Sequence, residues 1–412
     1  MTDCTQTPTI EAGLSKPLDP REILIAHVLS HLKYGTLWVI FPSGATRKFE
    51  GITGRQKEAL SGILQIRRWS AIPRMLRGGS IGFAEGFMEG EWGSPNLPAL
   101  LNMLLPNLQG ILAKRSPLIW LRLFDRIRHL INRNSRSGSR KNIAYHYDLG
   151  NDFYTLWLDE TMTYSAAWFG GSDLSLEDAQ AAKYKRLAGI VGIQPEDHVL
   201  EIGCGWGGFA EYAVRTHGCK LTGLTLSKEQ LQYARQRMDR AKLGDQAEFL
   251  LRDYRDETRK FDHIISIEML EAVGEEYWPV YFETLKNSLR PGGRAGIQVI
   301  TIAEDRFDHY RKSADFIQKY IFPGGMLPTD SMVRQMADRK GLHLVDHADF
   351  GLDYAKTLCL WRERFIRNKD QVRSLGYDQR FLNMWDYYLS YCEAGFRQKS
   401  ISVRHYVFEN RI

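Results

Sequence analysis

The chain has 412 residues, a formal charge of +6 and a 43% share of hydrophobic residues. This length allows two or three domains, and the mild positive charge favours anionic partners such as phospholipid headgroups or nucleic acid. The N-terminus has neither a basic stretch nor an apolar core, so it does not resemble a signal peptide. No apolar run reaches the roughly 20 residues that span a bilayer. The five cysteines are odd in number and lack zinc-site spacing, which predicts no metal site and a reducing, cytoplasmic location.

The N-terminal part predicts a short tail and a small α+β domain. Residues 1–18 are polar and are expected to be disordered. Residues 19–112 begin with apolar residues at helical spacing, followed by two short β-like runs that flank a turn at 42–44. A glycine-punctuated stretch and a helix that begins near Pro95 close this domain.

Residues 113–141 predict a basic linker. From residue 114 on they carry nine Lys and Arg against the single Asp125, with apolar residues interleaved. Residues 117–133 therefore predict an amphipathic helix. It is either an ordinary linker helix with one solvated face or a helix that lies on an anionic membrane surface.

Residues 142–412 alternate strand-like and helical patterns, which is typical of a doubly wound parallel sheet. The expected strands are 198–203, 219–226, 247–253, 262–270 and 294–301. We therefore predict an α/β, Rossmann-like domain over 142–412, preceded by the smaller α+β domain.

A glycine-rich loop follows the first of these strands. The acidic Glu201 lies within the strand, and Gly203, Cys204, Gly205 and Gly207 follow it before a helix begins. Glycines at such a junction allow the backbone to pass close to a ligand. The ExGxGxG spacing differs from the GxGxxG loop that binds a pyrophosphate, which favours S-adenosylmethionine over a dinucleotide.

Polar residues at the ends of the next two strands extend this expected site. Thr225, Leu226 and Gln230 follow the second strand and are candidates for the ribose. Asp253 and Tyr254 follow the third strand and are candidates for the adenine. Successive strand ends meet at one edge of an open α/β sheet, where ligands bind.

Several longer motifs resemble the cyclopropane fatty acid synthase family over nearly the whole chain. They are NIAYHYDLGNDFYTLWLDETMTYSAAWF at 142–169, HVLEIGCGWGG at 198–208 and KYIFPGGMLPT at 319–329. The resemblance implies that residues 19–112 handle lipid and that Tyr164 and Ser165 contact the methyl donor. It also implies a bicarbonate ion beside the reacting carbon.

The positions that match the family's bicarbonate ligands are Ala166, Glu271, Gln298, Ile300 and Tyr354. Ala166 stands where the family usually has cysteine, and Gln298 stands where it usually has histidine. Cys392 matches a cysteine sometimes counted as the active-site residue, although a small buried apolar role is an alternative for it. Glu271 has an alternative too, as a helix N-terminal residue that serves only the helix dipole.

The resemblance implies that the methyl carbon of S-adenosylmethionine adds to the cis double bond of an unsaturated phospholipid acyl chain. The resulting carbocation loses a proton and closes a cyclopropane. Bicarbonate or a water oriented by Glu271, Tyr354 and Gln298 is expected to take that proton. The two departures leave a methylene, methyl-branched or furan-precursor product open as the alternative.

The expected partner is an unsaturated phospholipid bilayer, bound peripherally at its cytoplasmic, inner face. Nucleic acid is not expected, because no RNA-binding motif accompanies the basic linker. A small-molecule or nucleic-acid methyltransferase and a non-catalytic lipid-binding protein are the competing classes. A homodimer and a partner reductase are left open.

Overall fold

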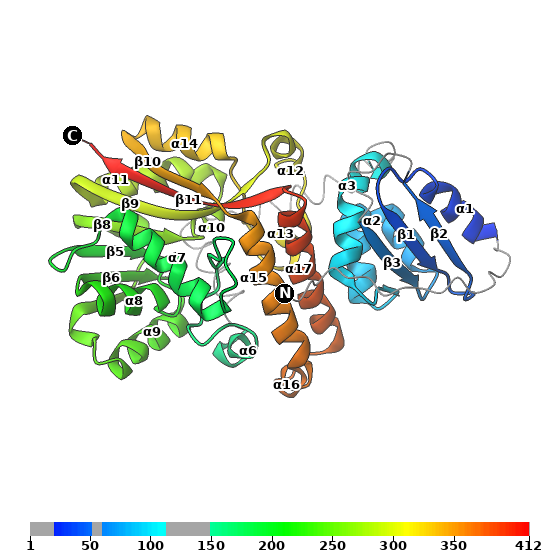
Figure 1. Ribbon diagram of the computed structural model, residues 1–412, viewed down its shortest axis with the longest axis horizontal. Coiled ribbons are helices and arrows are strands. Elements are labelled where there is room, and N and C mark those ends of the chain that lie inside the picture. Colours follow the sequence, from blue (N-terminus) through cyan, green and yellow to red (C-terminus); the bar gives the residue numbers. More distant parts are fainter. Residues whose placement is uncertain (1–19, 52–59, 113–148, 412) are drawn as a thin grey trace. The chain divides into compact units, whose positions relative to one another are not determined.

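The computed structural model describes residues 20–51, 60–112 and 149–411 and divides the chain into two compact units (Figure 1). The first unit contains residues 1–124 and 358–399, and the second contains 125–357 and 400–412. The predicted tail at 1–18 and the whole predicted basic linker at 113–141 lie outside the described residues. The division differs from the predicted boundaries, because residues 358–399 of the predicted methyltransferase segment group with the N-terminal unit.

The first unit is built on a four-stranded sheet with the strand order β2-β1-β3-β4. Its elements are α1 (Pro20–Leu29), β1 (Thr36–Ile40), β2 (Thr46–Glu50), β3 (Ser61–Ile66), α2 (Ala71–Met88), β4 (Trp92–Gly93) and α3 (Leu97–Leu112). β1 and β2 pair antiparallel, as the predicted hairpin requires, and β3 lies parallel to β1. α2 bends at Gly79, whose backbone has a φ of 55°, a value that glycine adopts more readily than other residues.

Three later helices belong wholly or partly to this unit: α15 (Gly351–Arg367), α16 (Lys369–Ser374) and α17 (Gln379–Arg397). α17 packs against α2 through an ion pair and a ring contact. Arg380 Nε lies 2.8 Å from a carboxylate oxygen of Glu89, and the rings of Phe87 and Tyr387 are 5.8 Å apart. These contacts explain why α17 groups with a segment about three hundred residues earlier in the chain.

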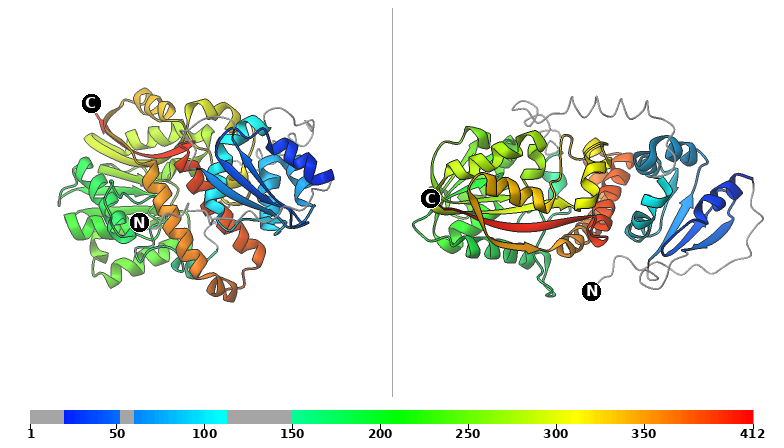
Figure 2. Two further views of the ribbon diagram at one scale, coloured as in Figure 1. Left: turned by 45° about the vertical axis from the view of Figure 1, so that its right-hand side comes forward. Right: turned by 90° about the horizontal axis from the view of Figure 1, so that it is seen from above.

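The second unit contains a seven-stranded sheet with the order β10-β11-β9-β8-β5-β6-β7. The strands are β5 (His198–Ile202), β6 (Lys220–Thr225), β7 (Ala247–Leu251), β8 (Phe261–Ile267), β9 (Leu289–Ile302), β10 (Leu342–Asp349) and β11 (Ile401–Asn410). β5 to β9 are parallel, which confirms the predicted doubly wound α/β fold. β11 adds to β9 in antiparallel register, and the two run side by side (Figure 2). β10 and β11 were not predicted.

Helices cover both faces of this sheet. They are α6 (Asn151–Thr155), α7 (Leu176–Val191), α8 (Gly208–His217), α9 (Lys228–Arg240), α10 (Leu270–Val273), α11 (Trp278–Ser288), α12 (Phe307–Tyr310), α13 (Phe316–Tyr320) and α14 (Asp330–Arg339). Short 3₁₀ turns lie at Gly244–Gln246, Tyr254–Asp256, Glu275–Tyr277 and Glu304–Arg306. Side chains of α7, α8 and α9 share one buried cluster, and those of α11 and α14 share another. Successive residues such as Ile264 and Ile265 on β8 point to opposite clusters, as strand geometry requires.

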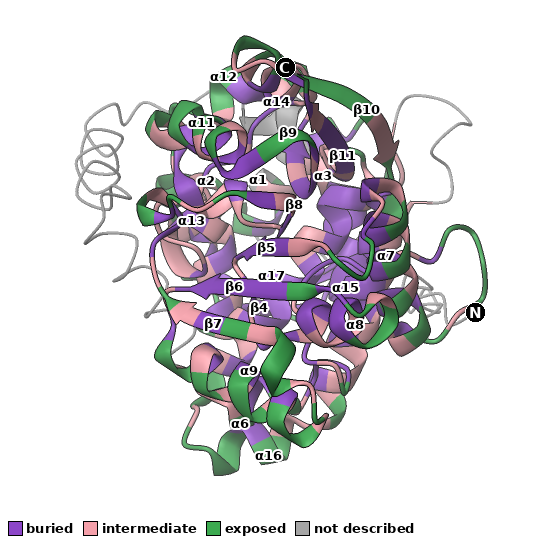
Figure 3. Cartoon of the chain, turned by 90° about the vertical axis from the view of Figure 1, so that its left-hand side faces the viewer, coloured by how far each residue is buried: buried purple, intermediate pink, exposed green. Residues whose placement is uncertain are grey.

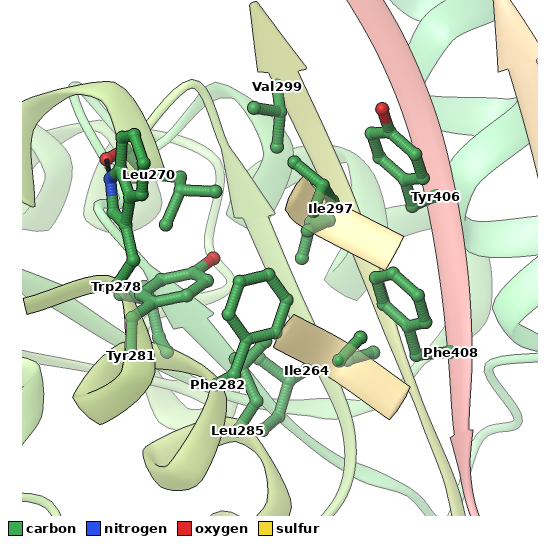
Figure 4. Close-up of a cluster of buried hydrophobic side chains, with 14 of the residues drawn as sticks. Ile264, Leu270, Trp278, Tyr281, Phe282, Leu285, Ile297, Val299, Tyr406 and Phe408 are labelled. Carbon is green, nitrogen blue, oxygen red and sulfur yellow. Dashed lines mark hydrogen bonds between the residues drawn. The ribbon is translucent and has the colours of Figure 1, made fainter. Parts of the chain in front are cut away.

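The cluster under α11 shows how firmly β8 is held (Figure 4). Ile264 of β8 and Ile297 of β9 are fully buried beside Phe282 and Leu285 of α11. Each such side chain contributes about 1.5–3 kcal/mol by leaving water. β5 and β6 are almost wholly buried as well (Figure 3). The carboxyl ends of these strands are therefore fixed positions for side chains. Within the described part of the chain, no helix combines the length and the apolar character needed to cross a bilayer.

Candidate active site

The glycine-rich loop joins β5 to α8 at the carboxyl edge of the sheet. Gly203, Gly205 and Gly207 have φ values of 81°, 51° and 81°, a region that favours glycine. The N–H groups of Gly203 and the buried Cys204 both donate to the carbonyl of Leu224, at 3.0 and 2.9 Å. A Cβ atom on Gly205 would meet no atom within 4 Å. The loop is thus fixed to β6 and borders open space at Gly205.

Glu201, next to this loop on β5, is a buried carboxylate with an incomplete set of partners. Its Oε2 atom has no hydrogen-bond partner among the described residues. Burial raises the pKa of Glu201 well above its ordinary value, and the charges of Lys183 and Arg237 counteract this. A ligand with an ammonium group would supply the missing partner. The loop and Glu201 therefore fit S-adenosylmethionine.

The predicted ribose candidates lie together at the end of β6. Thr225 and Gln230 are buried, and Thr225 Oγ1 donates to Gln230 Oε1 at 2.9 Å. Because this bond uses the carbonyl oxygen of Gln230, its amide N–H groups are the donors left to that side chain. Leu226 directly follows β6 and is partly exposed.

The predicted adenine candidates differ in their surroundings. Asp253 pairs with Arg255, whose Nη2 lies 2.6 Å from a carboxylate oxygen. The ring of Tyr254 is buried against Tyr281, and its hydroxyl has no partner among the described residues. Burial raises the pKa of Tyr254, so this hydroxyl stays protonated. The adenine roles of both residues stay predictions.

Tyr164 and Ser165 precede the loop in sequence and contact buried groups. The ring of Tyr164 lies 5.4 Å from that of Trp157. The Ser165 hydroxyl accepts a hydrogen bond of 2.6 Å from Lys183 Nζ. Lys183 is completely buried, and burial lowers its pKa to about 7 against the opposing charges of Glu268 and other carboxylates. A buried lysine thus lies close to the expected donor contacts.

A second group of residues gathers around Glu268, directly after β8. Ala166 N–H and Gln298 Nε2 donate to Glu268 Oε1 at 2.8 and 2.7 Å. The hydroxyl of Tyr354, on α15, donates to Glu268 Oε2 at 2.9 Å. The sequence prediction did not include Glu268, although a carboxylate three residues before Glu271 was a readable signal. Three of the expected bicarbonate ligands therefore bind a side chain of the protein itself.

Glu271 lies one turn further on and binds Ile300, another of the residues expected to hold bicarbonate. Its Oε1 accepts a hydrogen bond from Ile300 N–H, and its Oε2 is buried without a partner among the described residues. Its own carbonyl accepts from Met326 N–H at 2.9 Å, which joins it to the KYIFPGGMLPT motif. Burial and the charge of Glu268 raise the pKa of Glu271 to about 8. Two close carboxylates with raised pKa values are typical of proton-transfer sites.

His405 was also missed by the sequence prediction. The register of β11 against β9 places it opposite Gln298. Its Nε2 lies 2.8 Å from Gln298 Oε1, and its Nδ1 lies 3.0 Å from Nη1 of Arg186. Burial, together with the charges of Arg186 and Lys183, holds the pKa of His405 well below its ordinary value. His405 is therefore neutral and positions the amide of Gln298.

The structure thus brings together five of the six predicted catalytic positions, joined through Glu268 and Glu271: Ala166, Glu271, Gln298, Ile300 and Tyr354. Cys392 lies half-buried on α17 in the first unit, and its role stays a prediction. Within the described ranges, no cluster of three or more His, Cys, Asp and Glu side chains could hold a metal ion.

A parallel sheet with a glycine-rich loop after β5 and paired carboxylates after β8 defines the chain as an S-adenosylmethionine-dependent methyltransferase. The family model for mycolic acid cyclopropane synthetase matches residues 134–406. The chain belongs to this family, and S-adenosylmethionine is its methyl donor.

Relatives in this family differ in their named products. The tuberculostearic acid methyltransferase UfaA1 of Mycobacterium tuberculosis is 43% identical over 82% of this chain and 81% of its own length. The cyclopropane-fatty-acyl-phospholipid synthase of Escherichia coli is 34% identical over 85% of this chain and 88% of its own length. The solved structure of the cyclopropane synthase MmaA2 from Mycobacterium tuberculosis covers 66% of this chain and 98% of its own, with 30% identity and a TM-score of 0.62.

Proposed function

We propose that the chain transfers the methyl carbon of S-adenosylmethionine to the cis double bond of an unsaturated phospholipid acyl chain, giving a cyclopropane. When bound, the donor supplies an electrophilic methyl group. Glu201 and the 203–207 loop hold it, and the open space at Gly205 accommodates it. The E. coli relative is named for this product and substrate.

The observation that carries the proposal is the pair of carboxylates beyond β8. Addition of a methyl group to a double bond leaves a cation on the acyl chain, which must then lose a proton. Glu268 directly follows β8, the strand next to β5, and Glu271 lies on α10 just beyond it. Both are therefore at the edge of the sheet where the donor loop begins. Burial raises the pKa of Glu268, which makes this carboxylate more basic than an exposed one and suited to accept such a proton.

A methylene or methyl-branched acyl chain, or a furan-precursor chain, is the second candidate product. Two observations favour it. Ala166 and Gln298 depart from the family's usual cysteine and histidine, and the 43% identical relative is named for tuberculostearic acid rather than for a cyclopropane. The methyl transfer is the same in both candidates, and only the fate of the cation differs. A partner reductase would be needed to turn a methylene into a saturated branch.

The test uses the full chain, deuterium-labelled methyl donor and vesicles of a monounsaturated phospholipid, with saturated phospholipid vesicles as the matched control. We expect label in the unsaturated lipid only. Mild reduction of the labelled product then separates the candidates, because a methylene group takes up hydrogen and a cyclopropane does not. Label in neither lipid, from a chain that still binds the donor, would contradict the proposal.

We further propose that the chain acts peripherally at the inner face of the membrane, where its substrate lies. The net positive charge of +6 supports binding to anionic lipid. Co-sedimentation with vesicles tests this point, and we expect binding to anionic vesicles that weakens as salt is raised. Equal binding to neutral and anionic vesicles would contradict the electrostatic contribution.

A further inference from the structure

We propose that the Glu268 carboxylate takes the place of the bicarbonate ion that the family resemblance implies, and that Glu268 receives the proton lost by the alkylated acyl chain. This inference rests on the proposed function, because it assigns a residue to one step of that reaction. Bicarbonate and a carboxylate both present two oxygen atoms that share a negative charge. One can therefore replace the other within the same set of hydrogen-bond donors.

The donors expected to hold bicarbonate are already bound. Ala166 N–H and Gln298 Nε2 donate to Glu268 Oε1, and the Tyr354 hydroxyl donates to Oε2. The last expected donor, Ile300 N–H, donates to Glu271. A bicarbonate ion could bind these groups only after the Glu268 side chain had moved away. The residues present therefore do not fit a separate ion.

The orientation of the Gln298 amide supports an anion at Glu268. The guanidinium of Arg186 can only donate, so Nδ1 of the neutral His405 accepts from it. Nε2 of His405 then carries the proton and donates to Gln298 Oε1. The amide nitrogen of Gln298 consequently points at Glu268 and at the carbonyl of Ala166, 3.3 Å away. A flipped amide would place an oxygen against two acceptors.

Charges around the site oppose an additional anion. A free bicarbonate would be a second negative group beside the Glu268 carboxylate, and like charges in one buried site repel. Burial raises the pKa of Glu268, whereas the Ala166 N–H, the Gln298 amide and the charge of Lys183 lower it. Glu268 is thus a carboxylate that is more basic than an exposed one and is still held in place by its donors.

The backbone at Glu268 also suggests a functional residue. Its φ of 51° lies in the left-handed region, which side chains with a Cβ atom rarely adopt. The surrounding structure fixes this conformation, since Glu268 N–H donates to the carbonyl of Gln298 at 2.8 Å. A glycine would adopt it without strain. A strained residue that presents its side chain to a set of matched donors is expected where the side chain takes part in function.

The proposed step balances as follows. The C–H bond that breaks belongs to the newly added methyl group, and its proton forms an O–H bond with a carboxylate oxygen of Glu268. For the ring product the cation stays on the neighbouring chain carbon. For the methylene product a hydride first shifts along the chain, so that the cation lies on the carbon that bears this methyl group. The electron pair of that C–H bond either closes the ring or forms a new double bond, which neutralises the cation. Glu268 then returns the proton to water before the next turnover. No oxidant, reductant or added base is consumed.

Two substitutions at Glu268 separate this proposal from a structural role. Glu268→Gln keeps the size of the side chain but removes the basic carboxylate. Glu268→Gly removes the side chain, suits the positive φ and frees the donors of Ala166, Gln298 and Tyr354. Glu196→Gln, at an exposed residue, is the matched control. Donor binding by calorimetry shows whether each variant is folded.

Turnover is measured in bicarbonate-depleted buffer and again with added bicarbonate. The wild type and Glu196→Gln should have the same kcat in the depleted buffer and in the buffer with added bicarbonate. Glu268→Gln should lose at least about a hundredfold in kcat in both buffers, as expected for loss of a general base. Glu268→Gly should lose as much in depleted buffer and regain activity with bicarbonate. A wild type that requires bicarbonate, or a fully active Glu268→Gln, would overturn the inference.

A binding measurement keeps this test independent of the proposed function. ¹³C-labelled bicarbonate, observed by NMR in the presence of each protein, should bind Glu268→Gly and neither the wild type nor Glu268→Gln. Binding to the wild type at the same affinity as to Glu268→Gly would overturn the inference even if no lipid product formed. Absence of labelled lipid with all proteins, at any bicarbonate concentration, would instead count against the proposed function.

Discussion

Replacement of Glu271 by glutamine should make the protein more stable as it makes it inactive. Burial and the neighbouring charge of Glu268 raise the pKa of the Glu271 carboxyl from 4.5 to about 8. In the unfolded chain this carboxyl ionises near its ordinary pKa, whereas in the folded protein it still holds its proton at neutral pH. The wild type therefore loses stability as the pH rises from about 4.5 to about 8, and the loss is complete above that range.

The gap between the two pKa values corresponds to at most about 5 kcal/mol. Glutamine has no proton to lose and can still accept the hydrogen bond from Ile300 N–H. The difference in free energy of unfolding between Glu271→Gln and the wild type should thus be small near pH 5 and should reach several kcal/mol near pH 8. Turnover should be abolished while donor binding is retained.

Unfolding curves at a series of pH values, followed by circular dichroism, measure this difference. Glu196→Gln, at an exposed position, is the control and should follow the wild type at every pH. A stability difference for Glu271→Gln that does not change with pH would refute the reasoning, because it would mean that the carboxyl ionises alike in both states. Unchanged product formation would refute the assignment of Glu271 to the reaction.

Three further substitutions test separate parts of the site. Gly205→Ala should weaken donor binding at least about tenfold by calorimetry, because the added Cβ enters the open space at the loop. Gly44→Ala is the control: it places alanine at a similar positive φ, in a turn of the first unit, at a backbone strain of about 1 kcal/mol or more. It should leave donor binding unchanged. Cys392→Ala should retain the wild-type rate of lipid labelling, and a large loss would assign the thiol a catalytic role. His405→Phe should lower kcat with an unchanged KM for the donor, because it removes the bond that orients the Gln298 amide, and a change in KM alone would contradict this.

The parallel strands were predictable because each carries its own local signal. β5 to β8 are short apolar runs followed by glycine or polar residues. Each observed strand begins within about one residue of its predicted start. β10 and β11 had no comparable signal. β11 pairs with β10, about sixty residues earlier in the chain, and with β9, about a hundred residues earlier. Such long-range pairing is not encoded in a local pattern.

The site was predicted in the same uneven way. The family resemblance placed Ala166, Gln298 and Tyr354 at one centre, and they do meet there. Glu268 was missed because it lay inside the predicted strand 262–270, which continues beyond the observed end of β8 at Ile267. Its contribution depends on a positive φ that turns the carboxylate toward these donors, and that angle is fixed by tertiary contacts. His405 was missed because only the register of β11 brings it opposite Gln298.

The two departures from the family pattern make sense together if Glu268 is the base. A histidine at 298 could become protonated and form an ion pair with Glu268, which would lower the basicity of the carboxylate. Gln298 donates a hydrogen bond without adding a charge, and the buried, neutral His405 behind it fixes its orientation. Ala166 contributes only its backbone N–H, so a side chain there is not needed to bind the anion. A fixed carboxylate thus explains the neutral donor at 298, and it leaves the side chain at 166 without a part in binding the anion.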